Sequence, residues 1–182
     1  DALPICLISA VGEDENGLAL LQHTERIGVD VSDVLRVAHA RTGIYVSIND
    51  AQGDLSIAVN DMAVLKHLTA DHLSEKQSLL AQAALIVADT NLSQDCLTAL
   101  FEQAASVPLF MDPVSVQKAP KIRKHLAKIH TLKPNRLEAE YLSGLALDDE
   151  AAAPAAAEWF LQQGVTNIVL SLGERGLYCA NR

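Results

Sequence analysis

The sequence predicts an α/β fold in which helices cover both faces of a mainly parallel β-sheet, with a small antiparallel hairpin inserted. Two observations carry this prediction. Apolar runs of strand length alternate with helix-like segments along most of the 182 residues, which is the pattern of parallel strands joined by helical crossovers. Between residues 34 and 60, two β-rich runs around a dense turn signal interrupt that alternation.

The first strand and helix are expected within the N-terminal thirty residues. Residues 5–11, ICLISAV, form a continuous apolar run, which is typical of a strand buried on both faces. Leu18 and Leu21 follow at helical spacing, and Gly28 ends the predicted helix. These residues therefore predict a β-turn-α unit.

A hairpin is expected next. Residues 42–48, TGIYVSI, and 55–59, LSIAV, are rich in β-forming residues, and the segment NDAQGD between them is a strong turn signal. The two runs predict antiparallel strands with one apolar and one more polar face, and residues 34–37 are expected to add a strand. We therefore expect one domain over residues 1–182, with a hairpin region at about 34–60.

After the hairpin the alternation of helices and strands resumes. The predicted helices cover residues 73–83, 93–105, 119–129, 135–143 and 151–163. The predicted buried strands cover residues 84–88, 107–111, 131–132 and 167–172.

Composition narrows the classes of function. The chain has 14 basic and 23 acidic residues, a net charge of −9, which argues against a nucleic-acid polymer as a partner and leaves a nucleotide open. The sequence has no uncharged apolar run of 18 or more residues, so no membrane span is expected. The three cysteines are scattered in apolar runs, which is typical of buried thiols in a reducing, cytoplasmic setting.

Polar residues follow the predicted strands, where open parallel sheets bind ligands. Such loops are polar in most proteins, so position alone decides no single residue. The segments concerned are Gly12-Glu13-Asp14, Asp89-Thr90-Asn91, Asp112-Pro113, Lys133-Pro134-Asn135 and Ser171-Leu172-Gly173.

Asn135 and Glu138 form the strongest local signal. Their spacing fits a helix capping box. It also fits an amide and a carboxylate that order a hydrated Mg²⁺ beside phosphate groups, because Mg²⁺ usually keeps several waters. Spacing alone leaves both interpretations open.

Residues 131–144, TLKPNRLEAEYLSG, resemble the Asn-x-x-Glu motif of the PfkB, or ribokinase-like, kinase family. Residues 9–17 resemble the family's first conserved loop, Thr42-Gly43 the start of its β lid, and residues 170–176 its nucleotide-binding turn. The resemblance covers nearly the whole chain. It implies a three-layer αβα fold with a small antiparallel lid, and phosphoryl transfer from ATP, with Mg²⁺, to a small-molecule hydroxyl.

Within this family, residues 58–62, 87–93 and 112–115 resemble the pseudouridine kinase branch. That resemblance implies the 5′-hydroxyl of pseudouridine as the acceptor. Two alternatives stay open. One is a kinase for ribose, fructose or another nucleoside. The other is a non-catalytic domain that binds a ligand or dimerises through the exposed edges of its lid.

The resemblance also implies roles for individual residues. Asn135 and Glu138 would organise Mg²⁺, through water, and the ATP phosphates. Ser171, Leu172 and Gly173 would line the nucleotide site.

The substrate side is implied in the same way. Tyr45 and Ser47 alternate on one strand of the lid, so both would face the substrate, and Tyr45 could either stack on a pyrimidine ring or pack within the lid. The remaining residues expected to border the substrate pocket are Asn60, Asp61, Asp89, Thr90 and Asn91.

Two family features are not found in the sequence. The catalytic Asp of the family's Gly-Ala-Gly-Asp motif would lie beyond Arg182, and a substrate-anchoring Asp with a Gly-Gly pair would precede Asp1. We therefore expect the chain to be an internal part of a kinase, truncated at both ends and inactive by itself. The basic residues of the 119–129 region are interpreted as a solvated helix face: Lys118, Lys121, Arg123, Lys124 and Lys128.

Overall fold

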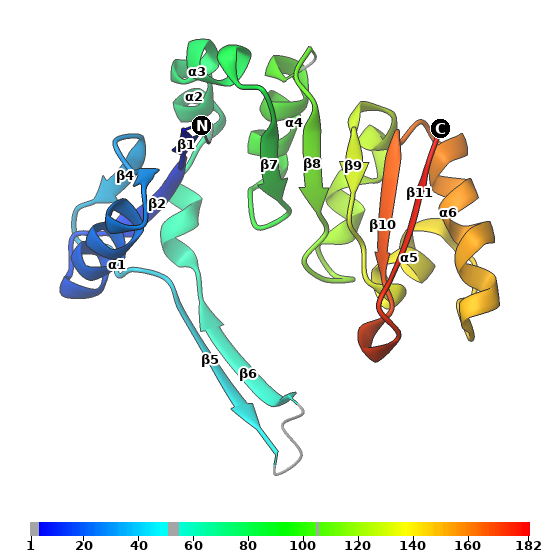
Figure 1. The fold of residues 1–182 in the computed structure, drawn as a ribbon. Coiled ribbons are helices and arrows are strands. Elements are labelled where there is room, and N and C mark those ends of the chain that lie inside the picture. The colour runs from blue at the N-terminus through cyan, green and yellow to red at the C-terminus, as the bar shows by residue number, and fades with distance from the viewer. Residues whose placement is uncertain (1–3, 51–54, 105) are drawn as a thin grey trace. The chain divides into compact units, whose positions relative to one another are not determined.

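The computed structural model describes residues 4–50, 55–104 and 106–182 (Figure 1). The chain divides into two compact units, Asp1–Thr69 and Ala70–Arg182. None of the helices in the described residues is long and apolar enough to cross a membrane.

The first unit contains two parallel strand pairs and a helix. Strand β1 (Ile5–Cys6) pairs with β3 (Val29–Asp30), and β2 (Ser9–Gly12) pairs with β4 (Val34–Val37). Helix α1 (Glu15–Arg26) follows β2, and Leu21 of α1 packs with Val11 and Val34 in the core. The predicted β-turn-α unit is therefore confirmed.

The single strand predicted at residues 5–11 is wrong in two respects. It is two short strands, because β1 and β2 pair with different partners, and Leu7 N donates to Asp30 O between them. It is also not buried on both faces, since Ile5 is 63% exposed. An apolar run predicts a strand, but it does not report where the strand changes partner.

The antiparallel hairpin consists of β5 (Ile44–Asn49) and β6 (Leu55–Asp61), followed by the 3-10 helix η1 (Ala63–His67). The hairpin confirms the prediction made from residues 42–59. Residues 34–37 do form a strand, but that strand pairs with β2 and not with the hairpin.

The second unit is built on a five-stranded sheet with the order β11-β10-β9-β8-β7. Strands β7 to β10 are parallel to their neighbours, and β11 is antiparallel to β10. The mainly parallel sheet predicted from the sequence is confirmed. The strands are β7 (Ile86–Asp89), β8 (Leu109–Asp112), β9 (Thr131–Leu132), β10 (Asn167–Ser171) and β11 (Leu177–Asn181).

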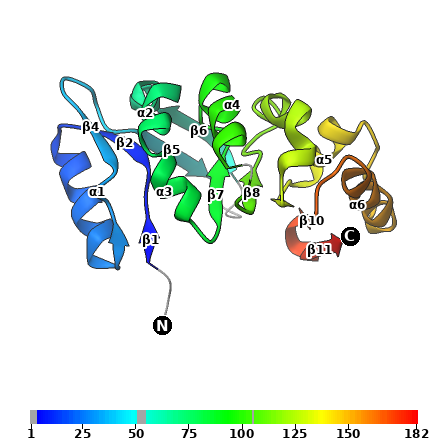
Figure 2. The same ribbon diagram turned by 90° about the horizontal axis from the view of Figure 1, so that it is seen from above.

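The helices between these strands lie on one face of the sheet (Figure 2). Strand order follows chain order from β7 to β10, and right-handed crossovers that all step in one direction place their helices on the same side. Neighbouring helices pack in sequence, α4 on η2, η2 on α5 and α5 on α6. The helices of the unit are α2 (Ala70–Glu75), α3 (Gln77–Gln82), α4 (Gln94–Gln103), η2 (Ala119–Lys128), α5 (Arg136–Ser143), η3 (Glu150–Ala152), α6 (Ala153–Gln162) and η4 (Gly173–Arg175).

Because of this arrangement, burial alternates along the strands. Leu109, Met111 and Ile168 face the helices and are at most 1% exposed. Val87 of β7 faces the other way and is 71% exposed. Within the described residues of this unit, the expected helical cover is therefore present on one face of the sheet.

Three predicted helices differ in detail. The segment 73–83 is two helices, because Lys76 N donates to Leu73 O in a tight three-residue turn that separates α2 from α3. The segment 119–129 is a 3-10 helix, η2. The helix predicted at 93–105 is α4, and Ser93 caps it by accepting a hydrogen bond from Cys96 N, as expected.

Candidate functional site

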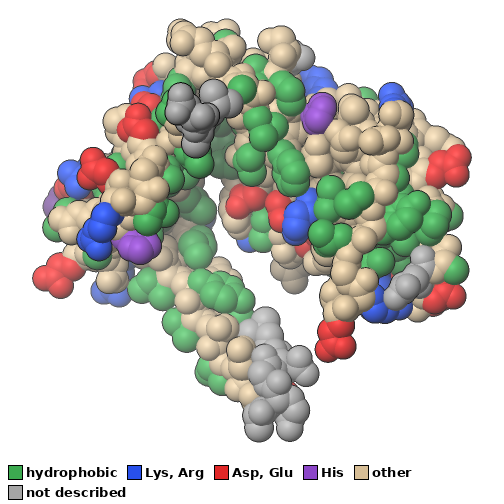
Figure 3. All heavy atoms as spheres, viewed as in Figure 1, with side chains coloured by type: hydrophobic (Ala, Val, Ile, Leu, Met, Phe, Trp, Pro, Cys, Tyr) green, Lys and Arg blue, Asp and Glu red, His purple; other side chains and the backbone are tan. Residues whose placement is uncertain are grey.

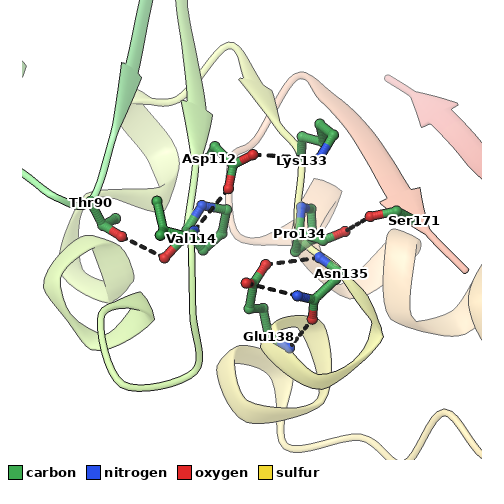
Figure 4. Close-up of polar contacts among 9 residues, drawn as sticks. Thr90, Asp112, Val114, Lys133, Pro134, Asn135, Glu138 and Ser171 are labelled. Carbon is green, nitrogen blue, oxygen red and sulfur yellow. Dashed lines mark hydrogen bonds and ion pairs between the residues drawn. The ribbon is translucent and has the colours of Figure 1, made fainter. Parts of the chain in front are cut away.

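Loops at one edge of the second unit's sheet bring together most of the predicted nucleotide-binding residues. Strands β7 to β10 are parallel, so their carboxyl ends meet at the same edge. Asp112, Lys133, Asn135 and Ser171 follow or end three neighbouring strands, and Figure 4 shows their side chains close together. These residues form the candidate site of this unit.

Asn135 and Glu138 hold each other at the N-terminus of α5. Asn135 Oδ1 accepts from Glu138 N at 2.9 Å, and the Glu138 carboxylate accepts from Asn135 N and Asn135 Nδ2, each at 2.8 Å. This is a complete capping box. The structural interpretation of the motif is therefore confirmed, and the geometry leaves the metal interpretation available, because Asn135 is exposed at the edge of the sheet.

Glu138 is an unusual carboxylate because it is only 2% exposed. Burial raises the pKa of Glu138 above its ordinary value, and the nearby negative charge of Asp112 raises it further. The hydrogen bonds from Asn135 and the positive charge of Lys133 act in the opposite direction. The site therefore places two acidic side chains near each other with one lysine to balance them.

Ser171 joins the second predicted nucleotide segment to the first. Ser171 N and Ser171 Oγ both donate to Pro134 O, at 3.0 and 3.2 Å, and the backbones of Asn135 and Ser171 form an isolated β-bridge. Leu172 N donates to Gly176 O at 2.9 Å, which closes a tight turn with Gly173 in the left-handed region at φ 65°. The two segments predicted to bind the nucleotide therefore lie side by side.

The loop after β7 lines a pocket of about 530 Å³. Asp89 and Asn91 contribute to its wall together with Asp112 and Val114. Asn91 N and Asn91 Nδ2 donate to the two oxygens of Asp89, at 2.7 and 2.8 Å. Two of the three residues predicted in this loop thus face a pocket as one hydrogen-bonded pair.

Thr90 differs from the expectation, because it does not line this pocket. Its side chain is fully buried, and its hydroxyl donates to Pro113 O. Thr90 N also donates to Asp112 O at 3.1 Å. Thr90 therefore fastens the loop after β7 to the loop after β8.

Asp112 and Lys133 belong to the site, although they were not among the residues predicted to bind a ligand. Asp112 Oδ2 lies 3.4 Å from Lys133 Nζ, and Asp112 Oδ1 accepts from Val114 N at 2.8 Å. Val114 has φ 63°, a conformation that β-branched residues rarely adopt and that often marks functional sites. The sequence signal for Asp112 and Lys133 was their position at the carboxyl ends of β8 and β9.

The lid residues belong to the first unit. Tyr45 and Asn60 are directly opposite each other across β5 and β6, and Ser47 lies two residues further along the same face. Asp61 pairs with Ile44 and so lies on the opposite face, where Asp61 Oδ1 accepts from Ala63 N. Three of the four predicted lid residues therefore share one face, and Asp61 does not.

A second polar cluster lies at the base of the hairpin. Asp14 caps α1 by accepting from Gly17 N, and its carboxylate also accepts from Thr42 N at 2.8 Å and from the Thr42 hydroxyl. Thr42 Oγ1 in turn accepts from Gly12 N at 3.0 Å. The hydrogen bonds that the Asp14 carboxylate accepts lower its pKa, and the bond from the Thr42 hydroxyl contributes most. The cluster links the loop after β2 to the start of the lid.

Oxygen donors suited to Mg²⁺ are present, but they do not form a cage. The described residues contain no group of three or more His, Cys, Asp or Glu side chains placed to hold a metal ion. Both oxygens of Glu138 are already bonded to Asn135. The donor set therefore fits a Mg²⁺ ion that keeps most of its waters and is bound through them.

Comparison with known proteins identifies the family. The model of the pfkB family of carbohydrate kinases matches residues 4–182. The chain belongs to the pfkB family. The family expected from the Asn-x-x-Glu resemblance is thereby confirmed.

Individual relatives agree with this assignment. Pseudouridine kinase of Escherichia coli strain K12 is 44% identical over 94% of this chain and 55% of that protein. The uncharacterized sugar kinase YeiI of the same strain is 37% identical over 97% of the chain and 49% of that protein. An E. coli protein assigned as ribokinase II, solved in complex with ATP and Mg²⁺, is 17% identical, with a TM-score of 0.83, over 99% of this chain and 60% of that one. The chain thus spans about half the length of the curated relatives.

Proposed function

We propose that the chain is the central part of an ATP-dependent kinase that phosphorylates the 5′-hydroxyl of pseudouridine. The observation that carries the proposal is the junction of Asn135 and Glu138 with Ser171 at adjacent strand ends. The 44% identity to pseudouridine kinase supports the choice of acceptor. Membership of the pfkB family supports phosphoryl transfer as the reaction.

The nucleotide side of the proposed mechanism uses the edge of the second unit's sheet. Asn135 and Glu138 would hold Mg²⁺ through water, and the ion would supply positive charge to the ATP phosphates. The left-handed turn at Gly173 lets the backbone approach the nucleotide closely. Phosphoryl transfer depends mainly on positioning and on stabilising charge, and these residues would supply the positioning.

In the second unit, Asp89 and Asn91 are the residues proposed to bind the acceptor. Tyr45, Ser47 and Asn60 lie on the lid in the first unit, and their contact with the acceptor stays a prediction. Asp89 can accept hydrogen bonds from a hydroxyl or a ring N–H. Tyr45 offers an exposed ring, 56% accessible, to a planar base. The catalytic base is expected in a Gly-Ala-Gly-Asp motif, which these 182 residues do not contain.

The test is an activity panel on the full-length protein that contains this chain. With Mg·ATP, it would be assayed on pseudouridine, uridine, ribose and fructose, and products would be identified by mass spectrometry. We expect pseudouridine to have the highest kcat/KM. Activity on ribose or fructose without activity on pseudouridine would favour the sugar-kinase alternative, which the similarity to YeiI supports. Phosphorylation of none of them would contradict the proposed reaction.

We also propose that the apolar face of the lid pairs with a second copy of the chain. Figure 3 shows hydrophobic side chains along the hairpin. A contiguous apolar face of this kind is uncommon on a monomer, and a hairpin also offers unpaired edges. The exposed residues of this face are Ile44, Val46, Ile48, Ile57 and Val59, which are 46–63% accessible.

Light scattering tests the pairing. Val46→Lys places a charge on the apolar face and is expected to convert a dimer to a monomer. Ser47→Lys, on the opposite face of the same strand, is the matched control and should leave the dimer intact. A full-length wild-type protein that is monomeric at all concentrations would contradict the pairing, and a full-length dimer with no kinase activity would favour a non-catalytic, dimerising domain.

A further inference from the structure

The sequence predicted that the basic residues near η2 form one solvated face, but the structure shows that they do not. Arg123, Lys124 and Lys128 are exposed, whereas Lys118 and Lys121 are half-buried. The side chains of Lys118 and Lys121 both contact the loop after β7.

The contacts of Lys121 are to backbone. Lys121 Nζ donates to Thr90 O at 2.9 Å and to Leu92 O at 2.7 Å, the carbonyls on either side of Asn91. Gln94 Nε2 donates to Lys121 O at 3.1 Å, which adds a bond in the reverse direction. One lysine thus holds the loop backbone at two points.

The contact of Lys118 is to a side chain. Lys118 Nζ donates to Asn91 Oδ1 at 2.5 Å. A lysine ammonium can only donate, so Asn91 must present its oxygen to Lys118 and its NH₂ group to Asp89. Asn91 Nδ2 indeed donates to Asp89 Oδ2 at 2.8 Å. Lys118 therefore fixes which way the Asn91 amide points, and through it the orientation of the Asp89 carboxylate in the pocket.

Charge makes this arrangement sensitive to substitution. Burial lowers the pKa of Lys121, the neighbouring Lys118 lowers it further, and Asp89 raises it. The positive charges of Lys118 and Lys121 repel each other, which destabilises the folded state. The hydrogen bonds of both lysines to the loop must offset this repulsion. Charged donors give the stronger class of hydrogen bond.

We propose that Lys118 and Lys121 are positioning residues that hold Asp89 and Asn91 in the geometry that receives the acceptor. This inference rests on the proposed function, because it takes the pocket lined by Asp89 and Asn91 as the acceptor site. It goes beyond the family pattern, which supplied Asp89 and Asn91 but not the lysines. Neither lysine need touch the acceptor.

Steady-state kinetics of the full-length protein test the inference. Lys118→Met and Lys121→Met should each raise the KM for pseudouridine about tenfold, the scale of one lost charge-assisted hydrogen bond. The KM for ATP should stay within about twofold of the wild type. Lys124→Met, an exposed lysine on the same helix, is the matched control and should change neither. Lys118→Arg, which also only donates, should restore part of the affinity.

A second measurement needs no catalysis. Hydrogen exchange at Asn91 N, which donates to Asp89, should be faster in Lys118→Met and Lys121→Met than in Lys124→Met. Active variants that match Lys124→Met in both measurements would overturn the inference and leave the proposed function standing. If the wild type phosphorylates no acceptor, the proposed function and the acceptor role of the lysines both fail. Should Lys121→Met not fold, Lys118→Met decides the question, because it removes one side-chain bond only.

Discussion

Asn135 and Glu138 bond each other in both directions, the amide oxygen accepting from Glu138 N and the carboxylate accepting from Asn135 N and Nδ2. A capping box of this kind fixes two side chains that would otherwise rotate. Glu138 is nearly buried while Asn135 is exposed. The pair thus holds a buried carboxylate against an exposed amide in the proposed nucleotide site.

Removing the carboxylate should affect stability and nucleotide binding together. Glu138→Ala leaves two Asn135 donors without this partner, and we expect the free energy of unfolding to fall by about 1–2 kcal/mol. The KM for Mg·ATP should rise about tenfold or more, since the charge that orders Mg²⁺ is lost. Urea unfolding and steady-state kinetics of the full-length protein measure the two effects.

Glu140→Ala is the matched control for this change. Glu140 lies on the same helix and accepts from Arg136 and from Leu147 N. It should cost comparable stability without changing the KM for Mg·ATP. Equal changes in KM for both variants would show that helix stability alone governs nucleotide binding.

The raised pKa of Glu138 predicts a pH dependence. Burial favours the protonated form in the folded protein, so the folded state keeps a proton that the unfolded chain has lost above its ordinary pKa of 4.5. This contribution to stability is complete below that pH, and it is lost as the pH rises through the folded pKa. Mg²⁺ requires the ionised carboxylate, so Mg²⁺-dependent ATP binding should weaken over the same range as the pH falls.

The measurement is the free energy of unfolding of the full-length protein and of Glu138→Gln between about pH 4 and pH 8. The difference, wild type minus variant, should decrease as the pH rises. A difference that stays flat or increases would mean that Glu138 is not held in its protonated form by the fold.

Much of this fold was predictable because its signals are local. Ser93 and Asn135 are typical cap residues, and both cap helices as expected. Tyr45 and Ser47 lie on the same face of the hairpin, which follows from their two-residue spacing on one strand. Such features depend on a few neighbouring residues, and tertiary contacts rarely reverse them.

The parts that were missed depend on partners distant in sequence. In sequence, Thr90 resembles any polar loop residue. Its hydroxyl bonds Pro113 O, 23 residues further along the chain, and so it does not line the pocket. Lys118 and Lys121 have the composition of a solvated face, and only packing against the loop after β7 shows otherwise. The break between α2 and α3 at Lys76 is not marked by a glycine or proline in the sequence.

Thr42 is predicted to be a stability determinant of the first unit. Its side chain is 6% exposed, and its hydroxyl accepts from Gly12 N and donates to Asp14. Thr42→Val keeps the shape but leaves Gly12 N without this acceptor, which should cost about 1–3 kcal/mol of unfolding free energy. Thr98→Val is the control, since the Thr98 hydroxyl donates to Gln94 O on the surface of α4, and it should change stability by less than about 0.5 kcal/mol. Urea unfolding distinguishes the two, and similar losses would contradict the role of Thr42.

Substitution of Gly173 can distinguish an effect on backbone strain from an effect on nucleotide binding. Gly173 and Gly28 both have positive φ, 65° and 93°, and a Cβ on either would meet no heavy atom within 4 Å. Alanine at each position should therefore cost about 1–2 kcal/mol through backbone strain alone. Only Gly173 lies in the turn that follows β10 beside Asn135, so Gly173→Ala should also raise the KM for Mg·ATP, while Gly28→Ala should not. If both variants lose stability and neither changes the KM, the turn after β10 is not part of the nucleotide site. Asn135 and Glu138 would then be the residues that still support that site.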